Sequence, residues 1–109
     1  MRQREIMPNG ESKNWIRFCG AINGFRCRYN RWPDTVKVLE FFPDELKEKL
    51  SKDDYILLES KIKIIGDDSP YIATDDYGNS YNYGDEGFPE KKPDVLAQDW
   101  LGVMPDYYD

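Results

Sequence analysis

The residues best equipped for chemistry lie close together in the segment DDYGNSYNYGDEGF, which spans positions 75–88. It combines carboxylates, tyrosines and glycines, and this mixture suits a calcium loop, a catalytic carboxylate pair or a protein-binding surface. Each kind of site needs a particular spacing or environment, which separates the three. The candidate residues are Asp75, Asp76, Tyr77, Tyr81, Tyr83, Asp85 and Glu86.

Calcium loops of the EF-hand type place oxygen ligands at fixed positions and a glycine at the sixth. When this pattern is aligned at Asp75, Tyr77 occupies the third position and Ser80 the position of the glycine. When it is aligned at Asp76, Gly78 falls at the third position, where an oxygen ligand is required. Both alignments fail, so we expect no EF-hand site. A looser site of oxygen ligands stays open as an alternative without support from the sequence, and we expect no bound metal.

Enzymatic chemistry lacks several of its usual parts in this sequence. There is no histidine, which removes the commonest general base near neutral pH and any serine–histidine or cysteine–histidine couple. The carboxylates of 75–88 are crowded in a hydrophilic segment, without the apolar burial that raises a carboxyl pKa for acid catalysis. No phosphate-binding loop matches either. We therefore expect a protein that is not an enzyme and needs no cofactor.

The same segment has the composition of a protein-binding surface. Tyrosine offers a large contact area for little loss of conformational entropy, while glycine, serine and asparagine adapt to a partner. Tyr77, Tyr81 and Tyr83 lie an even number of positions apart, so they share one side if the chain between them is extended. Acidic pairs surround them at 67–68, 75–76 and 85–86. This arrangement favours a basic protein partner, and the alternative is that the rings pack on the fold itself.

Charge is divided unevenly along the chain, whose net charge is −6. Positions 1–42 hold eight Lys or Arg against four Asp or Glu, whereas positions 43–109 hold seven against seventeen. An acidic surface of this kind repels nucleic acid and anionic membranes and speeds the encounter with a basic partner. Acidic surfaces also serve solubility alone, so charge by itself leaves both interpretations open.

A basic and aromatic face is predicted in the N-terminal part. The dipeptide Asn23-Gly24 between two alternating segments is a strong signal for a two-residue type I′ hairpin. Its register places Trp15 opposite Trp32 and turns Cys19 and Cys27 to opposite faces, so we expect two reduced, largely buried thiols. The face with the tryptophans carries Trp15, Arg17, Arg26, Arg28 and Trp32.

This face suggests an alternative function. Tryptophans among arginines can stack on bases and pair with phosphates, as in proteins that bind single-stranded nucleic acid. They can equally pack on one another and on the aliphatic part of the arginine side chains. The sequence leaves both interpretations open, and nucleic acid is the less favoured partner because no complete ribonucleoprotein-type motif accompanies the face.

Shorter patterns predict the remaining elements of a single α+β domain. We expect a strand from Thr35, a short helix over 43–54, a strand over 61–65, and a strand over 71–74 that pairs with it across the intervening turn. Positions 55–60 fit a helix or a strand. The stretch PDVLAQDWLGVMP predicts a capped helix, with apolar anchors at Val95, Leu96 and Trp100 and stop signals at Gly102 and Pro105. The expected fold is a small antiparallel sheet with about two helices, and positions 1–12 are a candidate flexible segment.

These features resemble a known class of proteins. A compact acidic α+β chain with tyrosines among carboxylates is similar to the small immunity proteins that bacteria encode beside their toxins. The stretch SPYIATDDYGNSYNYGD, at 69–85, resembles a segment of the SMI1/KNR4-like immunity superfamily, whose long N-terminal helical region is not expected here. The resemblance implies stoichiometric inhibition of a toxin, such as a basic nuclease, by occlusion of its active site. Phage-encoded inhibitors of host defence proteins share this profile.

Location is predicted only from what the chain lacks. The longest run of apolar residues, Tyr55-Ile56-Leu57-Leu58, is far too short to cross a membrane. The first residues also lack the apolar stretch of a secretion signal. The simplest expectation is therefore a cytoplasmic protein that does not bind membranes.

Overall fold

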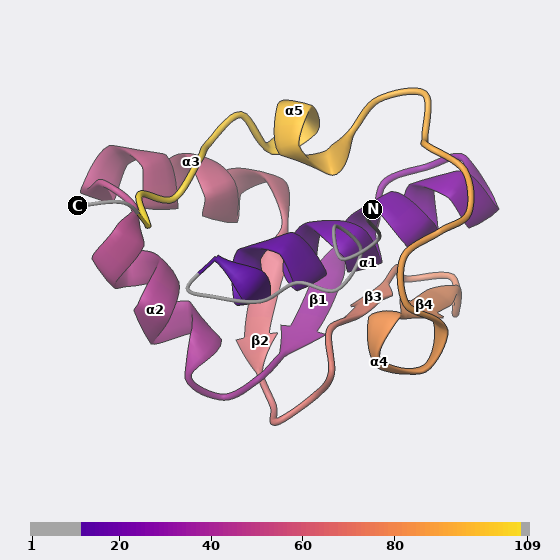
Figure 1. Ribbon diagram of the computed structural model, residues 1–109, viewed down its shortest axis with the longest axis horizontal. Coiled ribbons are helices and arrows are strands. Elements are labelled where there is room, and N and C mark those ends of the chain that lie inside the picture. The colour runs from indigo at the N-terminus through magenta and orange to yellow at the C-terminus, as the bar shows by residue number, and fades with distance from the viewer. Residues whose placement is uncertain (1–11, 108–109) are drawn as a thin grey trace, which may run out of the picture.

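One long helix, α1 (Lys13–Tyr29), lies across a face of a four-stranded sheet (Figure 1). The structure, a computed structural model, describes residues 12–107, so the predicted flexible segment lies outside it except for Ser12. The architecture is α+β, as the sequence indicates. The elements that follow α1 are β1 (Thr35–Val38), α2 (Phe42–Lys49), α3 (Lys52–Lys61), β2 (Lys63–Gly66), β3 (Ile72–Thr74), β4 (Ser80–Asn82), α4 (Tyr83–Glu86) and α5 (Ala97–Leu101).

The sheet is mixed rather than antiparallel, and its strand order is β2-β1-β3-β4. β1 pairs with β2 in parallel, whereas β3 is antiparallel to both β1 and β4. The strand predicted over 71–74 is present as β3, but it pairs with β1 and not with β2. The cause is the helical connection α2–α3, because a crossover of this kind returns the chain parallel to the strand that it left.

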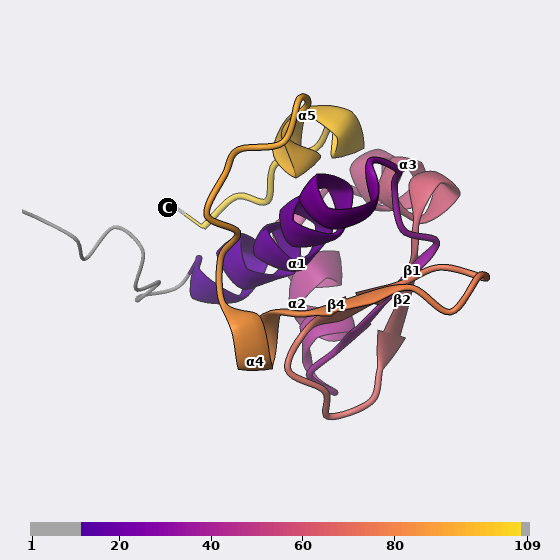
Figure 2. The same cartoon turned by 90° about the vertical axis from the view of Figure 1, so that its right-hand side faces the viewer.

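The two faces of the sheet differ in burial. Val36, Val38, Ala73 and Tyr81 point toward the helices and are almost completely buried. Lys37 lies between Val36 and Val38 on the opposite face and is exposed. In Figure 2, α1 and α5 lie on one side of the sheet. The core is therefore a single layer between α1 and one face of the sheet.

The predicted N-terminal hairpin is wrong, because residues 13–29 form α1. Trp15, Phe18, Ile22 and Phe25 recur at helical spacing and are all buried, so the helix places one apolar side against the sheet. The predicted hairpin would instead put Trp15 on the face opposite the other three. Burying the whole set together outweighs the local preference of an Asn-Gly dipeptide for a turn.

The dipeptide Asn23-Gly24 serves packing rather than a turn. The Asn23 side chain accepts a hydrogen bond from the backbone N–H of Ala97 at 2.7 Å, which attaches the C-terminal part of the chain to α1. A β carbon at Gly24 would lie less than 3.0 Å from the Tyr81 ring, so only glycine allows this ring to reach the helix. Glycine within a helix costs about 1 kcal/mol relative to alanine, and the close approach of Tyr81 explains its presence.

The helix also changes the positions of the cysteines and tryptophans. Cys19 is buried, but Cys27 is exposed, contrary to the expectation that both thiols are largely buried. Trp15 does not face Trp32, since Trp15 belongs to the core. Trp32 stacks instead on Trp100, with ring centroids 4.3 Å apart and planes 4° from parallel.

The other predicted elements are present, and their extents differ. The ambiguous stretch 55–60 is helical as part of α3, whose N-cap Ser51 accepts a hydrogen bond from the Asp54 N–H at 3.1 Å. The C-terminal helix is only the short α5, which ends at Gly102 in the left-handed conformation that its stop signal predicts. Val95, predicted as an anchor, is 42% exposed. None of the helices within residues 12–107 is long and apolar enough to cross a membrane.

Candidate functional site

The predicted protein-binding residues are divided between the two ends of the β3–β4 hairpin. Asp75, Asp76 and Tyr77 lie in the loop that joins the two strands. Asp85 and Glu86 lie in α4, beyond the other end of β4. Because the loop interrupts the segment that we expected to be extended, these residues do not form a single surface.

The three tyrosines have different environments. Tyr81 is 4% exposed, and its hydroxyl donates a hydrogen bond to the Gly87 carbonyl at 2.7 Å. Tyr83 is half-buried and meets the Phe88 ring edge-on, with centroids 5.1 Å apart. Only Tyr77, which is 73% exposed, presents its ring to solvent. Tyr81 therefore belongs to the core of the fold, and Tyr77 is the one member of the set that offers a large free contact area.

Asp75 organises the loop between β3 and β4. Its buried carboxylate accepts hydrogen bonds from the backbone N–H groups of Tyr77 and Asn79 at 2.9 and 3.0 Å, and from the Asn79 side chain at 3.0 Å. Burial acts to raise the pKa of Asp75, but these bonds and the nearby Arg31 guanidinium outweigh it and lower the pKa below its ordinary value. With Gly78 at a φ of 87°, these contacts account for the loop sequence structurally.

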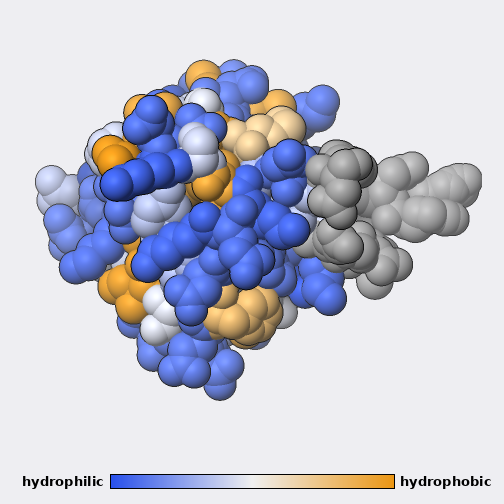
Figure 3. Space-filling model, turned by 90° about the vertical axis from the view of Figure 1, so that its left-hand side faces the viewer, coloured by the Kyte–Doolittle hydropathy of each residue, from blue (hydrophilic) through white to orange (hydrophobic). Residues whose placement is uncertain are grey.

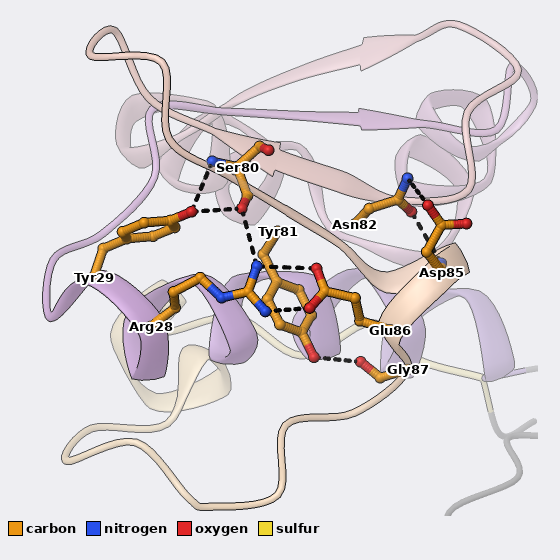
Figure 4. Close-up of polar contacts among 8 residues, drawn as sticks. All are labelled: Arg28, Tyr29, Ser80, Tyr81, Asn82, Asp85, Glu86 and Gly87. Carbon is orange, nitrogen blue, oxygen red and sulfur yellow. Dashed lines mark hydrogen bonds and ion pairs between the residues drawn. The ribbon is translucent and has the colours of Figure 1, made fainter.

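Arg28 joins α1 to α4 through Glu86 (Figure 4). Its guanidinium donates two hydrogen bonds to the carboxylate, of which Nη1 to Oε2 is 3.0 Å. The hydrogen bonds from Arg28 hold the pKa of Glu86 below its ordinary value. The same guanidinium lies over the Tyr81 ring, 4.8 Å from its centroid. The arginine that the sequence offers as a phosphate ligand is thus occupied within the fold.

Two further arginines are paired in the same way. Arg26 donates two hydrogen bonds of 2.9 Å to Asp94, which lower the pKa of Asp94 to about 2. Arg31 lies 3.5 Å from a carboxylate oxygen of Asp75, with its guanidinium 4.5 Å from the centroid of the Tyr77 ring. Each of these arginines comes from the basic part of the sequence and each carboxylate from the acidic part. The charge difference between the two parts is therefore partly cancelled inside the molecule.

The five residues proposed for nucleic-acid binding are not gathered into one open face. Trp15 is 6% exposed in the core, and Trp32 is covered on one side by Trp100. Arg26 and Arg28 bind carboxylates, and Arg17 contacts the hydroxyl end of a half-buried tyrosine, Tyr83. These contacts match the alternative interpretation, in which the tryptophans and arginines pack within the protein.

A set of exposed carboxylates lies together at one end of the sheet, and we call it the acidic end. β1 and β2 are parallel and β4 runs in the same direction, so the turns that follow these three strands meet at this end, which is the lower edge in Figure 1. Asp67 bonds to the Val38 carbonyl at 2.9 Å through its backbone N–H, which fixes two of the turns side by side. The turns contribute Glu40, Asp67, Asp68 and Asp85, all exposed, and contain no Lys or Arg.

A hydrophobic side chain and a groove adjoin the acidic end. Phe41 follows Glu40 directly and is 53% exposed. It lines a groove of about 710 Å³ that runs along α2. The charged residues that line this groove are the acidic Asp44, Glu45 and Glu48 and the basic Lys13 and Lys49. Figure 3 views the side of the molecule where α2 lies and shows mostly hydrophilic residues, with small, separate hydrophobic areas. A partner on this side meets charge and isolated apolar contacts rather than one large apolar patch.

A chain of buried and partly buried hydrogen bonds holds α2 in place beside this groove. The Tyr71 hydroxyl donates to the Asn14 side-chain oxygen at 2.9 Å, and the Asn14 amide donates to Glu45 at 3.2 Å. The Tyr107 hydroxyl donates to the other Glu45 oxygen at 2.6 Å. Burial, followed by the charge of Glu45, raises the pKa of Tyr71. The chain connects α1, α2, the start of β3 and the C-terminal segment, and no local pattern in the sequence indicates it.

Comparisons with known proteins leave the chain unassigned. No family model matches it, and no curated protein and no solved structure shows significant similarity to it. Within residues 12–107, no group of three or more Cys, Asp and Glu side chains is arranged to hold a metal ion. Function is therefore inferred from the residues and contacts of this chain alone.

Proposed function

We propose that this protein binds a basic protein and inhibits it by covering its functional surface, without chemistry of its own. The implied role is that of an immunity protein against a nuclease-type bacterial toxin. A phage-encoded inhibitor of a host defence protein would make the same physical demands. The observation that carries the proposal is the acidic end, where exposed carboxylates from three separate turns meet with no basic residue among them.

Within residues 12–107, no ion pair compensates the charge of the acidic end, whereas arginines compensate the charge of three other carboxylates. The ion pairs within residues 12–107 use Asp75, Glu86 and Asp94. None of them uses a member of the acidic end. Among its four carboxylates, Asp85 accepts a hydrogen bond from the Asn82 side chain at 3.2 Å, and Glu40, Asp67 and Asp68 remain available to a partner. Clustered charges of one sign raise the rate of encounter with a partner of opposite charge, often by tenfold or more at low salt.

Phe41 supplies the apolar contact that charge alone does not provide. Charged rims mainly set association rates, while a few desolvated aromatic side chains usually dominate the free energy of binding. Phe41 is half-exposed beside Glu40, and the groove beyond it has room for a side chain of the partner. The proposed contact surface therefore combines an aromatic anchor with a carboxylate rim.

The proposal changes which residues of the predicted set bind the partner. Asp85 remains, because it belongs to the acidic end. Tyr81 and Glu86 act within the fold, since one is buried and the other is paired with Arg28. Asp76 and Tyr77 lie at the opposite end of the sheet and become a control region.

The test begins by identifying the partner and ends with kinetics. The immobilised protein is exposed to lysate of its source organism, retained proteins are identified, and each is purified and measured by surface plasmon resonance. We expect a partner of high isoelectric point. The triple variant Glu40→Gln/Asp68→Asn/Asp85→Asn should slow association by about tenfold and flatten its salt dependence, whereas Phe41→Ala should mainly speed dissociation.

A matched control is available at the other end of the sheet. The variant Asp76→Asn/Tyr77→Ala removes one exposed carboxylate and one exposed ring, so it should leave both rate constants unchanged. Equal effects of the control and of the acidic-end variants would refute the proposed surface. Salt-dependent binding of single-stranded RNA that is abolished by Arg26→Glu/Arg28→Glu would refute the function itself.

A further inference from the structure

The two outer edges of the sheet differ in whether their outward backbone groups are hydrogen-bonded. At the β4 edge, the Tyr29 hydroxyl donates to the Ser80 carbonyl at 2.9 Å and accepts from the Ser80 N–H at 3.4 Å (Figure 4). Arg28 adds a hydrogen bond to the same carbonyl at 3.5 Å. Side chains of α1 therefore occupy the backbone groups that another strand would need, and this edge is closed.

At the β2 edge, within residues 12–107, no hydrogen bond of this kind closes the strand, although α2 and α3 pack beside it. The Lys63 N–H bonds to the carbonyl of Asp34, just before β1, at 3.0 Å, and the N–H of Asp67, just after β2, bonds to the Val38 carbonyl at 2.9 Å. Alternate residues of β2 therefore face β1. Ile64 and Gly66 then direct their N–H and C=O groups outward. No side chain and no other segment within residues 12–107 bonds to the backbone of these two residues, and Gly66 is exposed. An edge of this kind is a template for another strand.

We propose that β2 pairs with the β2 strand of a second copy, antiparallel about a two-fold axis, so that two four-stranded sheets become one. Among the registers that set outward-facing residues opposite one another, the one that bonds both Ile64 and Gly66 of each strand places Ile64 opposite Gly66 of the partner subunit. This register places Ile65 opposite the partner's Ile65. It also places Lys63 opposite the partner's Asp67, once on each side of the axis.

The charge pattern of the strand is the reason for choosing a second copy as the occupant. Lys63 begins β2 and Asp67 directly follows it, and both side chains are exposed. Reversing such a strand brings unlike charges together at both ends, and opposite charges on facing positions stabilise a strand pair. A lysine on an edge strand normally discourages pairing, but here the facing aspartate offsets it. The pairing engages one member of the acidic end, Asp67, and none of the other three. The inference does not rest on the proposed function.

Charge exchange provides a test that needs no partner protein. Sedimentation velocity over a concentration series should show a monomer–dimer equilibrium for the unmodified protein. Lys63→Asp should weaken the dimer by at least about tenfold, because two attractions become repulsions. Asp67→Lys should weaken it similarly, and the double variant Lys63→Asp/Asp67→Lys should restore it. The control Lys37→Asp, on the same face of the interior strand β1, should not change the dissociation constant.

Two outcomes would overturn the inference. One is a protein that stays monomeric at every concentration, and the other is a dimer whose stability is the same in the single and double variants. If circular dichroism shows that a single variant does not fold, hydrogen exchange of the unmodified protein tests the pairing instead. Exchange at the Ile64 and Gly66 amides that slows as the concentration rises supports the pairing, and exchange independent of concentration overturns it.

Discussion

Replacing Gly24 by alanine tests the central contact of the fold, between α1 and the Tyr81 ring. In an ordinary helix this change stabilises the protein by about 1 kcal/mol, because alanine has the higher helix propensity. Here the new β carbon would lie less than 3.0 Å from the ring. The ring cannot simply withdraw, since its hydroxyl bonds to Gly87 and the Arg28 guanidinium lies over it.

The magnitude follows from setting these two effects against each other. Overpacking a dense core costs about 1–3 kcal/mol, and a contact shorter than 3.0 Å with a fixed ring belongs at the upper end of that range. After subtracting the gain of about 1 kcal/mol in helix propensity, we expect Gly24→Ala to lower the free energy of unfolding by about 2 kcal/mol. In the background of Tyr81→Leu, which has no ring, the same change should raise it by about 1 kcal/mol.

Urea denaturation followed by far-ultraviolet circular dichroism measures all four proteins of this cycle. The expected result is a reversal of sign between the two backgrounds, with a coupling energy of about 3 kcal/mol. An effect of the same sign in both backgrounds would refute the contact. Destabilisation in both would specifically favour the type I′ turn, since alanine is strained there whatever residue occupies position 81.

Three further predictions follow from individual side chains. Because Arg26 lowers the pKa of Asp94 to about 2, this pair stabilises the fold above the pKa of the unfolded chain, near 3.9, and loses that effect as the pH falls toward 2. The melting temperature of the unmodified protein should therefore fall more steeply between about pH 5 and about pH 2 than that of Asp94→Asn, which lacks this carboxylate. Burial raises the pKa of the Cys19 thiol, while Cys27 is exposed. A thiol reagent should label Cys27 in the native protein and Cys19 only after unfolding, and labelling of both at the same rate would contradict the placement of Cys19. Tyr107→Phe removes a 2.6 Å hydrogen bond to Glu45, so urea denaturation should show a loss of about 1–3 kcal/mol, and an unchanged midpoint would count against the buried chain.

Local patterns predicted the elements whose environment is local. The strand at Thr35, the helix that begins near Pro43 and the left-handed stop at Gly102 depend on alternation, on a proline and on a glycine, and these act over a few residues. The sequence of α1 contains two conflicting signals. Asn23-Gly24 favours a turn, whereas the buried residues from Trp15 to Phe25 repeat at helical spacing. The helical signal prevails because it decides how much apolar surface the protein buries.

The contacts of the site depended on topology and so could not be read locally. A parallel pairing of β1 and β2 was needed to bring Glu40 beside Asp67, and it followed only from the helical crossover α2–α3. The charge difference between the two parts of the sequence indicates a surface for a basic partner or an aid to solubility, whereas the ion pairs Arg26–Asp94 and Arg28–Glu86 cancel part of it within the fold. Which carboxylate Arg28 would meet depended on where α4 crosses α1, and no spacing rule connects residues so distant in sequence.

The internal ion pairs separate two roles that acidic residues play in this protein. Glu86 and Asp94 face arginines of α1, so neutralising them removes contacts within the fold and should lower stability. Within residues 12–107, Glu40, Asp68 and Asp85 face no arginine, and Asp85 accepts a 3.2 Å hydrogen bond from Asn82. Neutralising Glu40 and Asp68 removes mutual repulsion, which should leave stability unchanged or slightly increase it. Natural sequences retain unfavourable charge clusters where a function requires them. A gain in stability together with slower association would therefore identify the acidic end as a binding surface, whereas a loss of stability would assign its carboxylates to the fold.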